Sequence, residues 1–137
     1  MKKILWLLTL SLTAAGLAAA ADHAYSKMAT AHDLMEAVVK PNMDKLAAMR
    51  KAGGPQEMKD WKHANAWASV MGEAGQTMLL DGWVKDAVWE EGAATLVEGA
   101  KATMTSAMRQ DAEGFNAGLT AMSQGCRTCH KAHKPKK

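Results

Sequence analysis

The chain is poor in the residue types that build β-sheets. It has one tyrosine, one phenylalanine and five tryptophans among 137 residues, and its β-branched residues do not cluster. Strands are enriched in β-branched and aromatic residues, so no segment is a good candidate for a strand. Alanine, methionine, leucine, glutamate and lysine, all good helix formers, dominate instead. The composition therefore predicts an all-α protein.

A long apolar run is absent after residue 21, so nothing there is expected to span a membrane. The start of the chain has a shorter run. Met1-Lys2-Lys3 is basic, residues 4–12 are apolar, and residues 18–21 are alanines. This is the pattern of a secretory signal peptide, because a membrane span needs roughly 20 apolar residues. We expect residues 1–21 to be cleaved off, after Ala20 or Ala21, and residues 22–137 to form one domain.

An excess of one charge is also missing. The full chain has a formal charge of +3, and the loss of Lys2 and Lys3 with the signal peptide would leave about +1. Proteins that bind nucleic acid usually carry a strongly basic face. The near-neutral balance therefore argues against nucleic acid as a partner.

Turn signals divide the expected mature chain into four helical segments of similar length. The candidate turns are Gly53-Gly54-Pro55, Leu80-Asp81-Gly82 and Gln110-Asp111. Short connections make neighbouring helices antiparallel, which predicts an up-down-up-down four-helix bundle. The helices are expected at about residues 24–51, 56–79, 84–108 and 112–132.

Mostly apolar residues at steps of three and four form a stripe along the first segment. The stripe consists of Tyr25, Met28, His32, Met35, Val39, Asn42, Leu46 and Met49. Pro41 lies within it, and a proline inside a helix costs about 3 kcal/mol. Because the stripe keeps its phase on both sides of Pro41, we expect a bent or locally widened turn near residues 37–41 rather than two separate helices.

The other three segments carry similar stripes, in which small residues are frequent. The second has Met58, Trp61, Ala68, Met71, Gly75 and Met78; the third has Val84, Val88, Gly92, Leu96, Gly99 and Thr103; the last has Phe115, Leu119, Met122, Cys126, Cys129 and His133. Helices lined with glycine and alanine either pack very close or leave room for something other than a side chain. The cysteines are expected on the buried face of the last helix.

Both cysteines of the chain lie in the stretch GCRTCHKAHK, residues 125–134. Cys126 and Cys129 are one helical turn apart, and His130 and His133 follow them. An exported protein enters an oxidising compartment, where thiols do not stay free by default. Four chemistries compete for these thiols: a structural disulfide, a redox-active pair, a zinc site and a covalently attached haem.

Three of the four suit the sequence poorly. A disulfide here would close a very small loop and remove little unfolded-state entropy. A redox-active Cys-x-x-Cys usually opens a helix that follows a strand. A zinc site would have four candidate ligands, namely Cys126, Cys129, His130 and His133, but structural zinc sites normally join two separate chain segments.

The fourth chemistry matches the spacing directly, because Cys-x-x-Cys-His is the attachment signature of a c-type haem. The two vinyl groups at the porphyrin edge need two thiols about one turn apart, and the adjacent histidine reaches the iron. We therefore expect Cys126 and Cys129 to hold one covalent haem c, with His130 as the proximal iron ligand.

At these residues the chain resembles the class II cytochromes c, which comprise cytochrome c′ and its low-spin relatives. The resemblance covers the whole expected mature chain and is most specific at residues 125–130, with Asp111 at the start of the same helix. The stretch LMEAVVKPNMDKLAAM, residues 34–49, is similar to the family's first helix. His133 and Lys134 depart from the family, which often has an aromatic residue and an arginine there. The resemblance implies an exported four-helix haem protein.

Within this family, the first helix decides the sixth coordination site of the iron. In cytochromes c′ the site is empty and the proteins bind nitric oxide and carbon monoxide, whereas in the low-spin relatives a methionine occupies it. The family's distal position falls at residue 35 or 36, and residue 36 is a glutamate, so Met35 is the first candidate. His32, Met28, Met43 and an empty site are the alternatives.

These observations combine into one expected function. No acid–base pair, nucleophile arrangement or phosphate loop stands out, so an enzyme is not expected. We predict a monohaem cytochrome in the periplasm of a Gram-negative bacterium, carrying single electrons between redox partner proteins. The alternative is a five-coordinate protein that binds nitric oxide or carbon monoxide. Whether the protein forms a homodimer is left open by the sequence.

Two histidines, two tryptophans and the lysines at the end of the chain are expected to lie outside the iron coordination. We expect His133 to be a solvated residue of a fraying terminus, although it could approach a haem propionate. His63 is expected at the surface, and Trp61 and Trp67 in the core, where they could pack beside the porphyrin. The C-terminal lysines are Lys131, Lys134, Lys136 and Lys137. They are expected to be favourable charges at a helix end, or a docking patch for an acidic partner.

Overall fold

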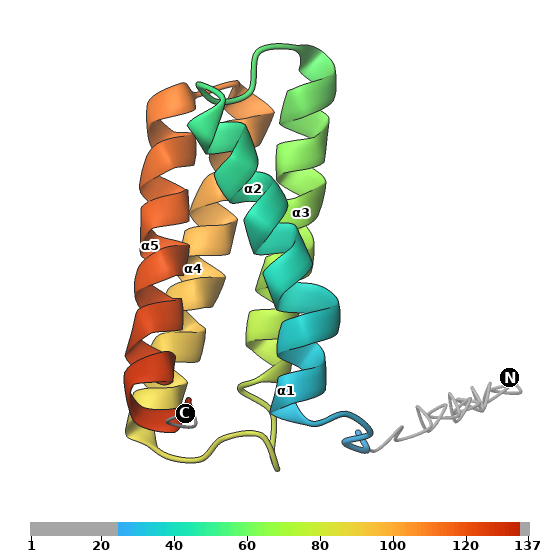
Figure 1. The fold of residues 1–137 in the computed structure, drawn as a ribbon, viewed down its shortest axis with the longest axis vertical. Coiled ribbons are helices and arrows are strands. Elements are labelled where there is room, and N and C mark those ends of the chain that lie inside the picture. The colour runs from blue at the N-terminus through green and yellow to red at the C-terminus, as the bar shows by residue number, and fades with distance from the viewer. Residues whose placement is uncertain (1–24, 135–137) are drawn as a thin grey trace, which may run out of the picture.

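The computed structural model describes residues 25–134, and these residues have the predicted all-α architecture (Figure 1). The expected signal peptide lies outside the described residues, as do His23, Lys136 and Lys137. The helical elements are α1 (Ala31–Leu34), η1 (Met35–Val39), α2 (Lys40–Lys51), α3 (Met58–Thr77), α4 (Ala87–Arg109) and α5 (Ala112–His133). The first three run on without a break and form one helix, which we call the first arm.

The first arm, α3, α4 and α5 pack in sequence as an up-down four-helix bundle, as predicted. Figure 1 shows α1, the α3–α4 connection and the last turns of α5 at one end, which we call the C-terminal end of the bundle. The α2–α3 connection and the α4–α5 turn lie at the opposite end. Short connections thus bring the cysteine-bearing turns of α5 to the same end as the start of the first arm.

The widened turn expected near residues 37–41 is present two residues earlier, as the π-helical segment η1. The backbone N–H of Lys40 bonds to the carbonyl of Met35, five residues earlier, which is the wider spacing of a π-helix. Asn42 helps to hold the segment, because its Nδ2 donates to the carbonyl of Val38 at 2.8 Å. The helix therefore passes Pro41 without breaking, and Met35 is the first residue of the widened turn.

The first arm begins later than predicted, at Ala31 rather than near residue 24. Thr30 forms a capping box with Asp33, in which each side chain accepts from the other residue's backbone N–H, and this fixes the start of the helix. The predicted stripe is therefore wrong before the cap: Met28 is 95% exposed.

Residues 25–27, which precede the cap, contact the α3–α4 connection instead. The Nζ of Lys27 donates to the carbonyl of Gly82 at 2.9 Å and lies 4.5 Å from the centre of the Trp83 ring. Trp83 also donates its indole N–H to the hydroxyl of Tyr25. These contacts hold residues 25–27 across the C-terminal end of the bundle.

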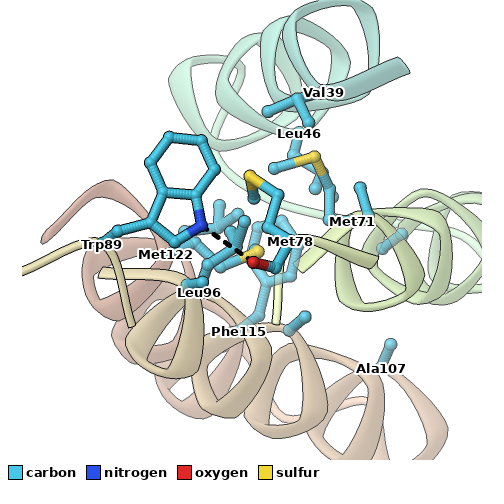
Figure 2. Packing of buried hydrophobic residues seen from close by; sticks show 14 of the residues in the cluster. Val39, Leu46, Met71, Met78, Trp89, Leu96, Ala107, Phe115 and Met122 are labelled. Atoms are coloured by element: carbon cyan, nitrogen blue, oxygen red, sulfur yellow. Dashed lines mark hydrogen bonds between the residues drawn. The ribbon is translucent and has the colours of Figure 1, made fainter. Parts of the chain in front are cut away.

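The core follows the predicted stripes over most of their length (Figure 2). Side chains from all four helices meet in it, and Leu46, Met71, Phe115, Leu119 and Met122 are fully buried. The stripes fail at the starts of two helices. Met58 and Val88 are exposed in the first turns of α3 and α4, and Val84 is exposed in the connection before α4, which begins at Ala87 rather than at residue 84.

Helices α4 and α5 approach each other very closely along their glycines. Of the two alternatives that the small residues left open, close packing is the one observed between these helices. A methyl group on Gly99 would lie 2.5 Å from the backbone nitrogen of Met122, and one on Gly118 would lie 2.7 Å from that of Thr103. Real Cβ atoms do not approach backbone atoms to these distances. The glycines therefore permit close packing of the two helices and leave no space between them.

Acid is expected to destabilise the bundle through its helix caps. The pKa values of Asp33, Asp60 and Asp86 lie below the ordinary 3.8, because each carboxylate accepts hydrogen bonds. Asp33 accepts from Thr30. Asp60 accepts from the backbone of Gln56, and Asp86 from the backbone of Trp89. Depressed pKa values stabilise the folded protein above pH 3.8, and this contribution is lost as the pH falls through the folded-state values. Thermal unfolding followed by circular dichroism between pH 7 and pH 2.5 should show the loss.

The Asp60→Asn variant gives this expectation a control. It should unfold at a lower temperature at pH 7 and should lose less stability on acidification than the unmodified protein. The same change at Asp81, an exposed residue of the α3–α4 connection, should leave the unfolding temperature at pH 7 as it is. Parallel pH profiles for the unmodified protein and Asp60→Asn would contradict the account of the caps.

Candidate functional site

Cys126 and Cys129 lie on adjacent turns near the end of α5 and are free thiols. Both are half-buried, and Cys126 packs against the hydrophobic core. Residues three apart on an α-helix share a face, so the two sulfur atoms lie on the side of α5 that faces the bundle. The predicted inward face is thus confirmed, and the cysteines are in a helix rather than in a loop.

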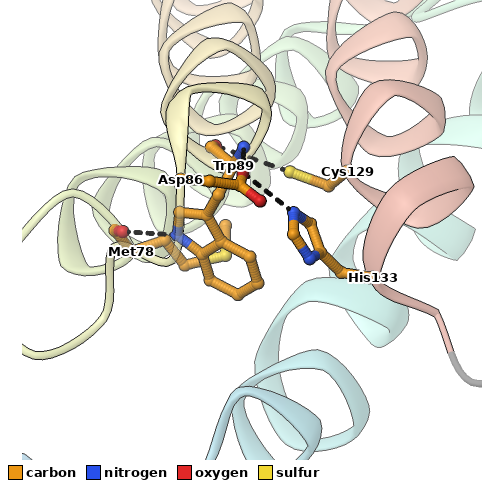
Figure 3. A network of polar contacts seen from close by, with 5 residues as sticks. All are labelled: Met78, Asp86, Trp89, Cys129 and His133. Carbon is orange, nitrogen blue, oxygen red and sulfur yellow. Dashed lines mark hydrogen bonds and ion pairs between the residues drawn. The ribbon is translucent and has the colours of Figure 1, made fainter.

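The thiol of Cys129 lies against the first turns of α4. Its Sγ donates to the backbone carbonyl of Trp89 at 3.6 Å (Figure 3). A methyl group on Gly92 would lie 2.3 Å from the same sulfur atom. Gly92 therefore makes room for the Cys129 side chain, a role that the sequence pattern did not single out.

Burial raises the pKa of both thiols. For Cys126 burial is the main cause, and for Cys129 burial is joined by the repulsion of Cys126 and Asp86. Redox-active and metal-binding cysteines act as thiolates, which a lowered pKa favours. The environment of these two residues therefore favours the protonated thiol and disfavours a redox-active pair.

The zinc alternative finds no support among residues 25–134. No group of three or more histidine, cysteine, aspartate or glutamate side chains converges there as metal ligands would. The reason lies in the helix: four ligands within two turns of one helix cannot surround an ion.

His130 is exposed next to Cys129 on α5. The pKa of its imidazole is lowered, first by the partial burial of the ring and then by the nearby Lys134 ammonium. A lowered pKa favours the neutral imidazole, which is the form that binds metals. The residue next to the second thiol is therefore suited to ligate iron.

His133 differs from the expectation of a solvated residue. Its side chain is only 15% exposed, and its Nε2 lies 3.2 Å from Oδ1 of Asp86. Its ring also packs on the Trp89 ring in a T-shaped arrangement, with 5.5 Å between the centres. The last turn of α5 is thus anchored to the start of α4, and His133 is part of that contact.

Met35 is the first residue of η1 and follows directly on α1, which lies at the C-terminal end of the bundle (Figure 1). It is half-buried against the core, whereas His32, the alternative ligand, is exposed. The π segment that begins at Met35 packs mainly on α3, and α5 contacts the first arm through α2. The fold thus places Met35 and the turn that carries His130 at the same end of the bundle.

The aromatic residues near the cysteines are not the ones considered from the sequence. Trp61 is buried against Phe115, with the rings 6.2 Å apart and nearly perpendicular, in the half of the bundle away from the cysteines. Trp67 is half-buried and stacks on His63, which is itself half-buried rather than at the surface. The tryptophan beside the thiols is Trp89.

The donor set as a whole fits a c-type haem. Two free thiols lie one turn apart on the inward face of α5, and a histidine with a lowered pKa follows directly.

Within residues 25–134, no helix has the length and apolar character that crossing a bilayer requires. Comparison with family models, curated proteins and solved structures found no match to the chain.

Proposed function

We propose that this protein is a monohaem c-type cytochrome that carries single electrons between protein partners in the periplasm. The observation that carries the proposal is the pair of free thiols on the inward face of α5, with His130 immediately after them. Haem iron takes up and releases one electron at a time, which is the chemistry that such a carrier needs.

The residues of the chain have distinct tasks in this proposal. The Cys126 and Cys129 sulfur atoms each form a carbon–sulfur bond to a vinyl group, and the thiol hydrogen passes to the other vinyl carbon, so attachment needs no oxidant. His130 donates its neutral imidazole to the iron, and Met35 completes the coordination.

The partner is proposed to dock at the C-terminal end of the bundle. His130, Lys131 and Lys134 are exposed there, and Lys85 of the α3–α4 connection is exposed at the same end. A protein with an acidic surface would be attracted by these lysines, with a strength that falls as salt is added. We therefore expect the electron to pass between the haem and the partner protein at this end of the bundle.

Replacing Met35 by alanine tests whether this residue is the sixth ligand. The unmodified reduced protein should have a low-spin spectrum that carbon monoxide does not change. Met35→Ala should have a high-spin ferric spectrum and bind carbon monoxide promptly, because an empty sixth site is open to gases. Optical spectra of both proteins, recorded with and without carbon monoxide, give the answer.

Met43→Ala is the matched control, because Met43 is also a half-buried methionine of the first arm that packs against the core. It should keep the low-spin spectrum. If the unmodified protein is already high-spin and binds carbon monoxide, Met35 is not a ligand and the gas-binding alternative is correct.

A further inference from the structure

The last turn of α5 is attached to the first turn of α4 through one carboxylate. Oδ1 of Asp86 accepts from the backbone N–H of Trp89 at 2.9 Å, which caps α4, and lies 3.2 Å from Nε2 of His133. The Asp86 side chain is 52% exposed, while that of His133 is 15% exposed. A histidine near the C-terminus of a helix normally faces solvent, so its burial here marks a specific contact.

Trp89, in the first turn of α4, also holds His133 in place. It is 4% exposed, and its indole N–H donates to the carbonyl of Met78 at 2.8 Å. Its ring packs on that of His133, and its backbone carbonyl accepts from the thiol of Cys129 (Figure 3). One buried tryptophan is therefore in contact with two residues of α5.

These two α5 residues stand on either side of His130. Cys129 precedes it directly, and His133 follows it by about one helical turn. The final residues of a helix fray unless side chains hold them. With both neighbours held against α4, the turn that carries His130 has one fixed rotation about the helix axis.

We propose that Asp86 and His133 are positioning residues, whose contact fixes the orientation of the His130 imidazole toward the haem iron. The inference rests on the proposed haem site, since it assigns a role to two residues that would not themselves bind the porphyrin or the iron. Contacts around a metal ligand orient it in metal sites, and here they would act through the turn of α5 that carries His130. The site would thus include the start of α4 as well as the end of α5.

The test uses variants that separate the cap from the anchor. Asp86→Ser keeps a capping oxygen for the N–H of Trp89 but is too short to reach His133. Asp86→Asn keeps an oxygen at the same reach and should rescue the contact. His133→Ala removes the other partner. Asp111→Ser changes the N-cap of α5, at the opposite end of the bundle, and is the matched control.

The first readout is the electron paramagnetic resonance spectrum of the ferric holoprotein, whose g-values report the orientation of axial ligands. Asp86→Ser and His133→Ala should shift or broaden the g-values, with thioether-bound haem retained. The double variant should show no more than either single one, because the two residues act as a pair. Asp86→Asn and Asp111→Ser should give the spectrum of the unmodified protein.

The second readout is amide hydrogen exchange in the last turn of α5, which needs no haem. Asp86→Ser should lower the protection of these amides by about tenfold relative to Asp111→Ser, because opening of the turn becomes easier. If Asp86→Ser equals Asp111→Ser in both readouts, the positioning role is wrong. If the unmodified protein carries no covalent haem but the exchange result holds, the proposed function fails while the anchor stands.

Discussion

Gly125→Ala should lower the free energy of unfolding by about 3 kcal/mol, near the upper end of the usual range for overpacking. A methyl group at Gly125 would lie 2.6 Å from the carbonyl oxygen of Gly92 and 2.7 Å from the backbone nitrogen of Leu96. Both are backbone atoms of a helix, so neither can turn away as a side-chain tip could. The two helices must separate, and the melting temperature should fall by about 10 °C.

Gly72→Ala is the matched control for this change. Gly72 is also buried in a helix, but a methyl group there would meet the Cβ of Ala100 at 3.4 Å, an ordinary van der Waals contact. Because alanine is the better helix former by about 1 kcal/mol, this variant should be as stable as the unmodified protein or more so. Urea unfolding of the three proteins measures the difference. Equal stability of Gly125→Ala and Gly72→Ala would show that α4 and α5 are not in close contact.

Replacing both Cys126 and Cys129 by alanine should abolish covalent haem while leaving the helices folded. The side chains are half-buried near the end of α5, so their loss removes little of the core. Each single variant should keep the haem through one remaining thioether, with a shifted absorption band because one vinyl group stays unsaturated. Haem staining after denaturing electrophoresis and circular dichroism of each variant test these expectations.

Thr128→Ala is the control for the cysteine variants, because Thr128 lies between the cysteines and is also half-buried. It should stain for haem as the unmodified protein does. Haem that survives denaturation in the variant without cysteines would exclude thioether attachment. Loss of helix signal in that variant would mean that the thiols support the fold itself.

Much of the fold could be predicted because helices leave a strong local pattern. The predicted ends of α3, α4 and α5 lie within three residues of the observed ones. The widened turn before Pro41 was predictable because the apolar spacing kept its phase across a residue that cannot donate a backbone hydrogen bond. The start of the first arm was not predictable. The apolar spacing continues back to Tyr25, but the capping box at Thr30 makes the helix begin at Ala31.

The candidate site was predictable only in part. The spacing of Cys126, Cys129 and His130 placed them on one face of a helix, because that depends on the chain's own periodicity. The contact between His133 and Asp86 joins residues that are 47 positions apart, and no local pattern predicts which carboxylate meets which histidine. In the same way, small residues alone did not decide whether α4 and α5 pack closely or leave a gap.

The central claim is the covalent haem, and the mass of the exported, matured protein under denaturing conditions tests it most directly. We expect the mass of a polypeptide that begins at residue 21 or 22, increased by that of one haem added without loss of atoms. A mass equal to the polypeptide alone, in protein matured by cells that attach haem to other cytochromes, would contradict it.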